Sequence, residues 1–388
     1  MRRFIDDYSN TAAVAGLLAV TVSFAGSGVI IFQAAKLAGL SQAQTASWIW
    51  AVSIGSGLTG ILLSWRMKIP VIAAWSTPGA ALLVATLPGM PFPEAVGAYM
   101  ASAAVIILIG LTGSLDALMR RIPGGVCSGM FAGILFSFGT KVFSAVQIDP
   151  LLALPMLAVF VAFRRISPRY AVMAVMAAGI AVAAFTGGMH FESLSLSPAM
   201  PVWTSPVWSW PAIISTALPL ALVTLTGQYI SGMAVLHASG YSVPSGGIMT
   251  VTGIASLLLA PFGSHSVCLS SLTAAICTGK EAHEDPARRY IAGMACGTFY
   301  SVVGLFGTTL MSLFASLPTV FIAVLAGLAL VSAFTTGIAG IVRDADNLEA
   351  GILTFLATAS GMELLGLGSP FWGLVIGLIT CAVLKKRP

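Results

Sequence analysis

Long apolar stretches without a single charge fill most of this chain. Residues 11–35, 193–279 and 290–342 contain no Asp, Glu, Lys or Arg. Charged residues make up 8% of the 388 residues, and the mean hydropathy is +0.97. A soluble domain averages about 25% charged residues, so a water-soluble fold is excluded. The chain is predicted to be an all-α polytopic membrane protein.

The apolar stretches divide at charges and at Pro/Gly turns into fourteen predicted membrane segments. Each span needs about 20 mostly apolar residues, which leaves short connections and no room for a soluble domain. The segments are residues 11–36, 44–64, 70–88, 94–115, 122–143, 150–164, 169–188, 210–237, 244–261, 264–279, 288–312, 317–336, 348–362 and 369–384. The third and tenth are too short and too interrupted to be full helices, and the thirteenth is short.

The basic residues predict the orientation. If the N-terminus is cytoplasmic, sixteen of the 18 Lys and Arg residues fall in cytoplasmic connections, and Lys36 and Lys141 fall outside. Lys and Arg collect on the cytoplasmic side of membrane proteins, so both termini are predicted to be cytoplasmic. The net charge of +5 then reflects topology, and no nucleic-acid partner is expected.

The two halves of the chain resemble each other weakly. The SPRYAVMAVMAAGIAVA run from Ser167 matches SPFWGLVIGLITCAVL from Ser369, at an offset of 202 residues. The IPGGVCSGMFAGILF run from Ile122 matches LPTVFIAVLAGLALV from Leu317, at an offset of 195 residues. Such a repeat contains seven segments, and an odd number inverts the second copy. Two inverted seven-segment repeats are typical of secondary transporters.

Both interrupted segments are interpreted as an extended piece followed by a half-helix. In the third, residues 71–75 favour an extended chain, Ser76 or Thr77 can cap a helix, and Pro78 suits its first turn. The tenth repeats this plan, with polar serines ahead of a short apolar helix. The residues at the two predicted helix starts are Ser76, Thr77, Pro78, Gly79, Cys268, Leu269, Ser270 and Ser271.

Non-helical backbone inside a membrane is tolerated only where it is buried in protein or lines a cavity. Inverted symmetry would bring the two half-helix N-termini together. Each exposes unpaired N–H groups and about half a positive charge, so the gap should attract an anion such as a carboxylate. The alternative is that both segments are ordinary kinked helices whose Ser and Thr side chains pack as polar edges.

Four runs resemble one known family. They are AWSTPGAALL from Ala74, SPRYAV from Ser167, LPLALVT from Leu218 and PFGSHSVCLSSLTAAIC from Pro261. In collinear order they resemble the BenE family of benzoate:proton symporters of the bacterial inner membrane. The resemblance implies the fold of uracil transporters and anion exchangers, with a core domain (1–116 and 201–313) and a gate domain (117–200 and 314–388). It also supplies benzoate and the proton as expected cargo, and a homodimer in membrane lipid as the expected assembly.

The eighth segment departs from the uracil-type relatives. They carry an acidic residue where this chain has Gln228, followed by Tyr229. A neutral side chain there suits an anionic substrate, which a fixed negative charge would repel. It also leaves proton coupling without an obvious carrier, for which His265 and Glu363 are the candidates. The alternatives are a histidine satisfied by water or backbone, and an interfacial glutamate.

Smaller features complete the list of candidates. Phe24 and Ser27 of the first segment lie in a Gly-rich run, where the aromatic ring could stack on a ring substrate or simply pack. The glycines from Gly124 to Gly133 are expected to serve helix packing. The run at residues 280–289, KEAHEDPARR, is expected to be a solvated connection. No metal site, disulfide framework or cofactor is predicted.

The leading functional hypothesis is a secondary transporter that alternates access around a central site for a small aromatic carboxylate. No GxxxxGK[ST] pattern occurs, so direct use of ATP is not expected. The alternatives are a passive anion channel and a transporter of another small organic anion or a nucleobase-like substrate. An enzyme would need clustered acids, histidines or a nucleophile with its base within the spans, and the sequence offers none.

Overall fold

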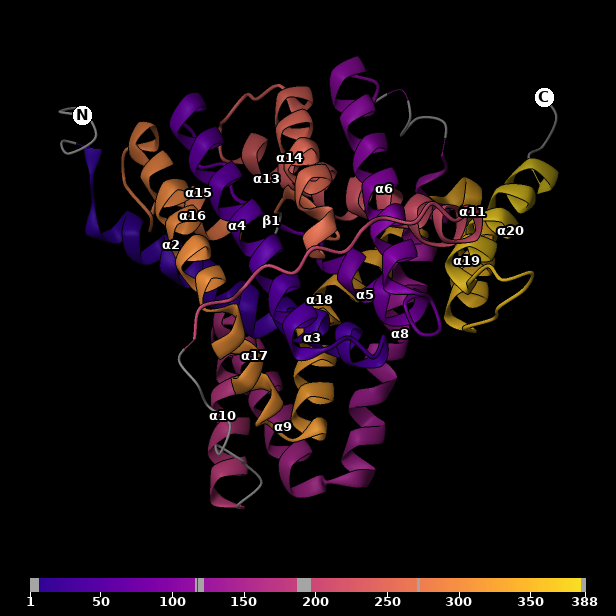
Figure 1. The fold of residues 1–388 in the computed structure, drawn as a ribbon, viewed down its shortest axis with the longest axis horizontal. Helices are drawn as coiled ribbons and strands as arrows, with labels where there is room; N and C mark the ends of the chain where they lie inside the picture. The colour runs from indigo at the N-terminus through magenta and orange to yellow at the C-terminus, as the bar shows by residue number, and fades with distance from the viewer. Residues whose placement is uncertain (1–6, 116, 118–121, 187–196, 271–272, 385–388) are drawn as a thin grey trace.

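The computed structural model describes residues 7–115, 117, 122–186, 197–270 and 273–384. They form a bundle of helices with one pair of short strands inside it (Figure 1). Seven helices in these residues are long and apolar enough to cross a membrane, or eight if one bent pair counts as a span. The chain therefore has the helical membrane architecture that its composition predicts.

Most predicted segments coincide with a continuous helix. These helices are α4 (Gln42–Met67), α6 (Phe92–Thr112), α8 (Gly124–Ile148), α9 (Pro150–Ile166), α10 (Ala171–Phe185), α14 (Ser245–Leu259), α18 (Thr319–Arg343), α19 (Leu348–Ala359) and α20 (Ser369–Leu384). Local sequence explains several of their ends. Ser41 and Gln44 form a capping box at the start of α4, and Asp149 caps α9 by accepting from Leu152 N.

The first and eighth segments contain π-helical turns that the sequence analysis does not predict. The first consists of α2 (Asn10–Ser23), η1 (Phe24–Gly28) and α3 (Val29–Leu37). The eighth consists of α11 (Trp210–Ala212), η4 (Ile213–Ala217), α12 (Leu218–Thr224), η5 (Leu225–Ile230) and α13 (Ser231–Ala238). Short 3-10 turns are η2 (Pro168–Tyr170), η6 (Ala260–Phe262), η7 (Pro286–Arg288) and η8 (Ala345–Asn347). Such π turns inside helices occur frequently at functional sites.

The eleventh segment is bent, although the sequence predicts one span. It forms α16 (Tyr290–Leu305) and α17 (Gly307–Ala315), and the helix axes differ by 73°. An extended stretch at residues 197–209 runs across this face of the bundle (Figure 1). Ala199 N donates to the carbonyl of Leu305 at 2.7 Å, so this extended stretch supplies a hydrogen-bond partner for a carbonyl at the end of α16.

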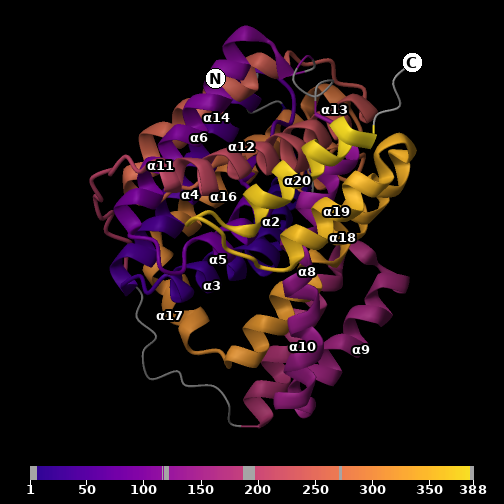
Figure 2. The same cartoon turned by 90° about the vertical axis from the view of Figure 1, so that its right-hand side faces the viewer.

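The helices pack as two groups, which lie on opposite sides in Figure 2. One group contains α8, α9, α10, α18, α19 and α20 and is called the second helix group. All the other described helices form the first helix group. Within the second group, Gly129 of α8 lies directly against the backbone of Gly351 in α19, so a side chain at either position would clash. The prediction that the glycines of the fifth segment serve helix packing is confirmed there.

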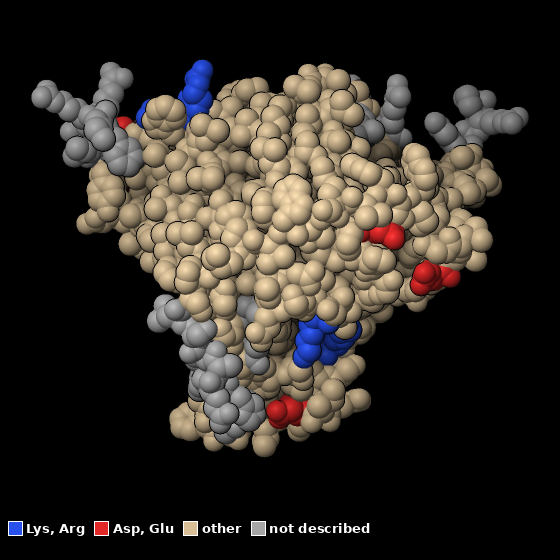
Figure 3. Space-filling view, in the orientation of Figure 1, with Lys and Arg blue, Asp and Glu red and all other residues tan. Residues whose placement is uncertain are grey.

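The surface agrees with a membrane environment. Figure 3 shows a face on which uncharged residues form an almost continuous surface, with few Lys, Arg, Asp or Glu side chains. Large apolar side chains point outward from several helices, among them Leu108, Leu111, Leu151 and Phe185. A contiguous apolar surface of this kind is unfavourable in water and suits contact with lipid.

Candidate substrate-binding site

The two interrupted segments meet as an antiparallel pair of strands. β1 (Ala73–Trp75) pairs with β2 (Val267–Leu269), with Ala74 opposite Cys268. α5 (Thr77–Thr86) follows the first strand and α15 (Ala274–Thr278) follows the second. The predicted plan of an extended piece and a half-helix is confirmed in both segments. Pairing gives the strand backbones hydrogen-bond partners at a depth where lipid offers none.

The second half-helix begins later than predicted. The sequence places its start at Cys268 to Ser271, but Cys268 and Leu269 belong to β2, and α15 begins at Ala274. Ser270 remains with the strand pair because its N–H donates to the carbonyl of Ile72 at 2.8 Å. Ser271 lies outside the described residues. The extended piece is longer than expected because it pairs with residues distant in sequence.

The N-terminus of α5 is largely satisfied by its own cap. Ser76 Oγ accepts from Gly79 N at 3.1 Å, and the Ser76 carbonyl accepts from Ala80 N at 2.8 Å. Thr224 donates its hydroxyl to Ser76 Oγ at 2.9 Å, which ties the cap to the eighth segment. Pro78 has no N–H. The N–H and hydroxyl of Thr77 make no hydrogen bond to any other described residue, so both are available to a ligand.

A narrow cavity lies beside these residues, between the two helix groups. Its volume is about 50 Å³, and one water needs about 10 to 15 Å³. The lining residues are Val22, Ser23, Gly26, Ser27, Ala74, Trp75, Thr77, Val172, Gln228, Ser270, Thr273, Ala329 and Leu330. Several waters or a small polar ligand group fit this space.

Four of the predicted binding residues line this cavity: Ser27, Thr77, Gln228 and Ser270. Ser76 lies behind them as the cap of α5, fully buried. Among the described residues, the others pack elsewhere. Tyr229 hydrogen-bonds Thr252 through its hydroxyl at 2.6 Å. The remaining contacts are Leu269 against Gly232, Pro78 against Gly227, and Gly79 against Leu220.

The aromatic residue on the cavity wall is Trp75, which the sequence analysis does not single out. Phe24, the predicted ring contact, packs edge-on against Trp75 with ring centroids 4.9 Å apart and does not line the cavity. Trp75 donates from Nε1 to Ser27 Oγ at 2.9 Å. The sequence feature that could have identified Trp75 is its position directly before Ser76-Thr77-Pro78-Gly79, the start of α5.

Hydroxyl groups supply most of the polar lining. Ser270 Oγ and Thr273 Oγ1 lie 2.6 Å apart, so one donates to the other, and the second hydrogen of the pair has no acceptor among the described residues. Gln228 is 6% exposed and presents its amide from the π turn η5. None of the described residues that line the cavity carries a charge. The polar part of the lining is therefore a neutral set of hydrogen-bond donors, and we call this space the neutral cavity.

His265 of the tenth segment contacts Ser76 of the third and does not line the cavity. Trp48 Nε1 donates to Nδ1 at 3.1 Å, and the Ser76 carbonyl lies 3.1 Å from Nε2. Because a carbonyl only accepts, the hydrogen belongs on Nε2 and the imidazole is neutral in this arrangement. His265 is 1% exposed. Both ring nitrogens are therefore engaged, Nδ1 by Trp48 of α4 and Nε2 by the cap residue of α5.

Glu363 lies in a different place. It is exposed in the connection between α19 and α20 and lines a second cavity, of about 290 Å³, together with Glu94 and Thr86. This second cavity lies between the C-terminal end of α5, the start of α6 and the α19–α20 connection. The structure therefore does not bring Glu363 to the neutral cavity.

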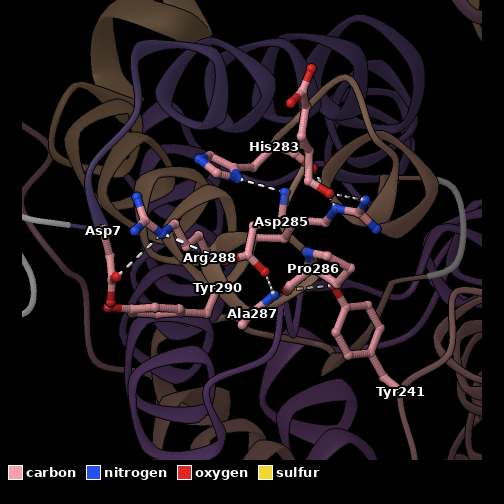
Figure 4. A network of polar contacts seen from close by, with 10 residues as sticks. Asp7, Tyr241, His283, Asp285, Pro286, Ala287, Arg288 and Tyr290 are labelled. Atoms are coloured by element: carbon pink, nitrogen blue, oxygen red, sulfur yellow. Dashed lines mark hydrogen bonds and ion pairs between the residues drawn. The ribbon is translucent and has the colours of Figure 1, made fainter.

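A polar network orders the connection between α15 and α16, which the sequence predicts to be solvated (Figure 4). Arg289 is 6% exposed and donates to the carbonyls of Thr278, His283 and Glu284. The Thr278 carbonyl ends α15, so the guanidinium caps the half-helix.

The rest of this network joins neighbouring segments to the connection. Tyr241 donates to the carbonyl of Pro286 at 2.9 Å, and burial raises the pKa of its phenol. The phenol therefore stays protonated at neutral pH. Tyr290 donates to Asp7 at 2.8 Å, and Asp7 lies 3.7 Å from Arg288. These contacts fix the chain on both sides of the α15 cap.

Nearly the whole chain matches one family model. Residues 6–383 match the family model described as benzoate membrane transport protein, BenE. The chain belongs to the BenE family. A benzoate membrane transport protein of Acinetobacter baylyi is 45% identical over 380 residues, which cover 98% of this chain and 96% of that protein. The inner membrane protein YdcO of Escherichia coli is 40% identical over 372 residues, 96% of this chain and 95% of that protein. This BenE-family chain is a membrane transporter and not an enzyme.

Solved structures share the fold at low sequence identity. The transmembrane domain of the cyanobacterial bicarbonate transporter BicA matches with a TM-score of 0.63 and 14% identity, over 96% of both chains. SLC26A9 matches with a TM-score of 0.65 and 15% identity, over 96% of this chain and 65% of that one. The arrangement of helices in this BenE-family protein is therefore similar to that of BicA and SLC26A9.

Proposed function

We propose that this protein imports benzoate or a related small aromatic carboxylate by proton symport. The observation that carries the proposal is the neutral cavity, in which uncommitted N–H and O–H donors lie beside the indole of Trp75. Donors without charge suit a carboxylate that must be released again, and an aromatic wall suits a ring. Membership of the BenE family and the name of the Acinetobacter baylyi relative support benzoate as the substrate.

The carboxylate is proposed to lie between Thr77 and the Ser270–Thr273 pair, with Gln228 beside it. Thr77 offers its N–H and its hydroxyl from α5, and the opposite pair offers one hydrogen. The short helix α15 adds little, since it begins beyond Ser270. These groups form the proposed carboxylate cradle, in which hydroxyls bind the carboxylate more than helix termini do.

Alternating access is proposed to move the two helix groups against each other. We propose that the core domain (1–116 and 201–313) is built around the first helix group and the gate domain (117–200 and 314–388) around the second. Fourteen membrane segments in two inverted halves remain the proposed topology, with both termini on the cytoplasmic side of a bacterial inner membrane. A homodimer is the proposed assembly.

Three carriers are candidates for the coupled proton. His265 could accept it only if Nδ1 gives up the hydrogen bond from Trp48, which would leave the buried indole N–H without this acceptor. Glu363 could accept it in the second cavity. The substrate carboxyl could also carry it, entering as the neutral acid. Variants at the two side chains separate these routes.

Uptake of labelled benzoate into proteoliposomes, with and without an inward proton gradient, tests the proposal. Protein-free liposomes and liposomes containing Gln228→Glu are needed as controls, because neutral benzoic acid crosses bilayers unaided. Saturable accumulation that collapses with a protonophore is expected. Accumulation that ignores the gradient would remove symport, and large non-saturating flux without accumulation would favour a passive anion channel.

A further inference from the structure

The hydroxyl oxygen of Ser23 accepts a hydrogen bond, while its hydrogen is not donated to any described residue. Tyr300 donates its hydroxyl to Ser23 Oγ, and the hydrogen of Ser23 has no acceptor among the described residues. Ser23 is 6% exposed and is one of the residues that line the neutral cavity. A buried hydroxyl that keeps a free hydrogen at a cavity wall is poised to donate to a ligand.

The neighbouring serine is engaged on both sides. Ser27 donates to the carbonyl of Ser23 at 3.0 Å and accepts from Trp75 Nε1 at 2.9 Å. Its hydrogen is therefore used, although it lines the same cavity. Of the two serines that the first segment presents, Ser23 is the one with a hydrogen to offer.

We propose that Ser23 is a further carboxylate donor in the site, and that Tyr300 is a positioning residue acting through it. The inference rests on the proposed carboxylate transport. A hydroxyl that accepts a hydrogen bond becomes a stronger donor through polarisation, and the occupied lone pair limits where its hydrogen can point. Tyr300 is fully buried and does not line the cavity, so it reaches a ligand only through Ser23.

Equilibrium binding of labelled benzoate to the purified full-length protein tests this assignment. The variants are Ser23→Ala, Tyr300→Phe and the double variant. Ser23→Ala should weaken benzoate affinity about tenfold to a hundredfold, as expected for a hydrogen bond to a charged group. Tyr300→Phe keeps the ring but frees the Ser23 hydroxyl to rotate, so it should weaken affinity by about threefold to tenfold.

The double variant distinguishes positioning from packing. If Tyr300 acts only through Ser23, the double variant should bind within about twofold of Ser23→Ala alone. Ser56→Ala and Tyr99→Phe are matched controls, since both residues are buried and neither lines the cavity. Both controls should keep wild-type affinity.

Wild-type affinity in Ser23→Ala would overturn the assignment, as would full additivity of the two changes. If Ser23→Ala fails to fold, Tyr300→Phe decides alone, and an affinity within twofold of wild type overturns the proposal. A wild-type protein that does not bind benzoate would instead refute the proposed function itself. The two failures are therefore distinguishable.

Discussion

Replacing Thr77 with valine should remove one ligand-binding hydroxyl while preserving the local structure. Valine has the same branched shape, and the cap of α5 is supplied by Ser76, so the helix should start unchanged. The Thr77 hydroxyl makes no hydrogen bond to another described residue that the change would break. A hydrogen bond to a charged group contributes about 1.5 to 3 kcal/mol, so benzoate affinity should fall about tenfold to a hundredfold.

The opposite side of the cradle needs a double change. Ser270→Ala releases Thr273 from its partner 2.6 Å away, and the freed Thr273 hydroxyl can still donate to the carboxylate. The single variant should therefore lose little, whereas Ser270→Ala with Thr273→Val should lose affinity comparably to Thr77→Val. This non-additivity is expected because the two hydroxyls share one hydrogen bond.

Equilibrium binding to purified protein measures these losses without the complication of passive uptake. Thr59→Val is the matched control, because Thr59 is buried in α4 and donates to the carbonyl of Gly55 at 2.6 Å, away from the cavity. Wild-type benzoate affinity in both Thr77→Val and the Ser270/Thr273 double variant, with normal thermal stability, would refute the cradle. The hydroxyls would then serve packing alone.

Three further predictions address charge, proton coupling and the α15 cap. Gln228→Glu should nearly abolish benzoate binding, because two like charges about 4 Å apart at an effective dielectric constant of about 20 repel by about 4 kcal/mol; Gln228→Met should retain more binding. His265→Gln should lower the unfolding temperature, since Trp48 and Ser76 lose a buried partner. If the pH dependence of uptake is unchanged in both His265→Gln and Glu363→Gln, the substrate carboxyl is left as the proton carrier. Arg289→Gln should destabilise the protein more than Lys280→Gln in thermal unfolding, because three backbone carbonyls lose a charged donor.

The sequence predicts the parts of the site that depend on local chemistry. Ser at the cap and Pro in the first turn are both favoured at helix starts, and the structure contains that arrangement at Ser76, Thr77 and Pro78. The apolar stretches likewise predict where the helices lie, because span length follows from bilayer thickness. These features need no knowledge of the rest of the fold.

The parts that depend on distant contacts could not be predicted. The start of α15 was misplaced because β2 extends to pair with β1, about 190 residues earlier in the chain. The sequence analysis names Phe24 and not Trp75 as a ring contact, because a sequence does not reveal which of two packed rings faces a cavity. The sequence does not reveal Ser23 as a donor for the same reason, since Tyr300, which occupies the acceptor side of its hydroxyl, belongs to the distant helix α16.

The distribution of polarity around the cavity suggests how release can occur. The six polar lining side chains all belong to the first helix group: Ser23, Ser27, Thr77, Gln228, Ser270 and Thr273. The second helix group contributes Val172, Ala329 and Leu330, which are apolar. An apolar wall can slide past a bound ligand without breaking hydrogen bonds, so the substrate should travel with the first group. Release then requires water to enter and compete for neutral donors, and no ion pair with the protein has to be broken first.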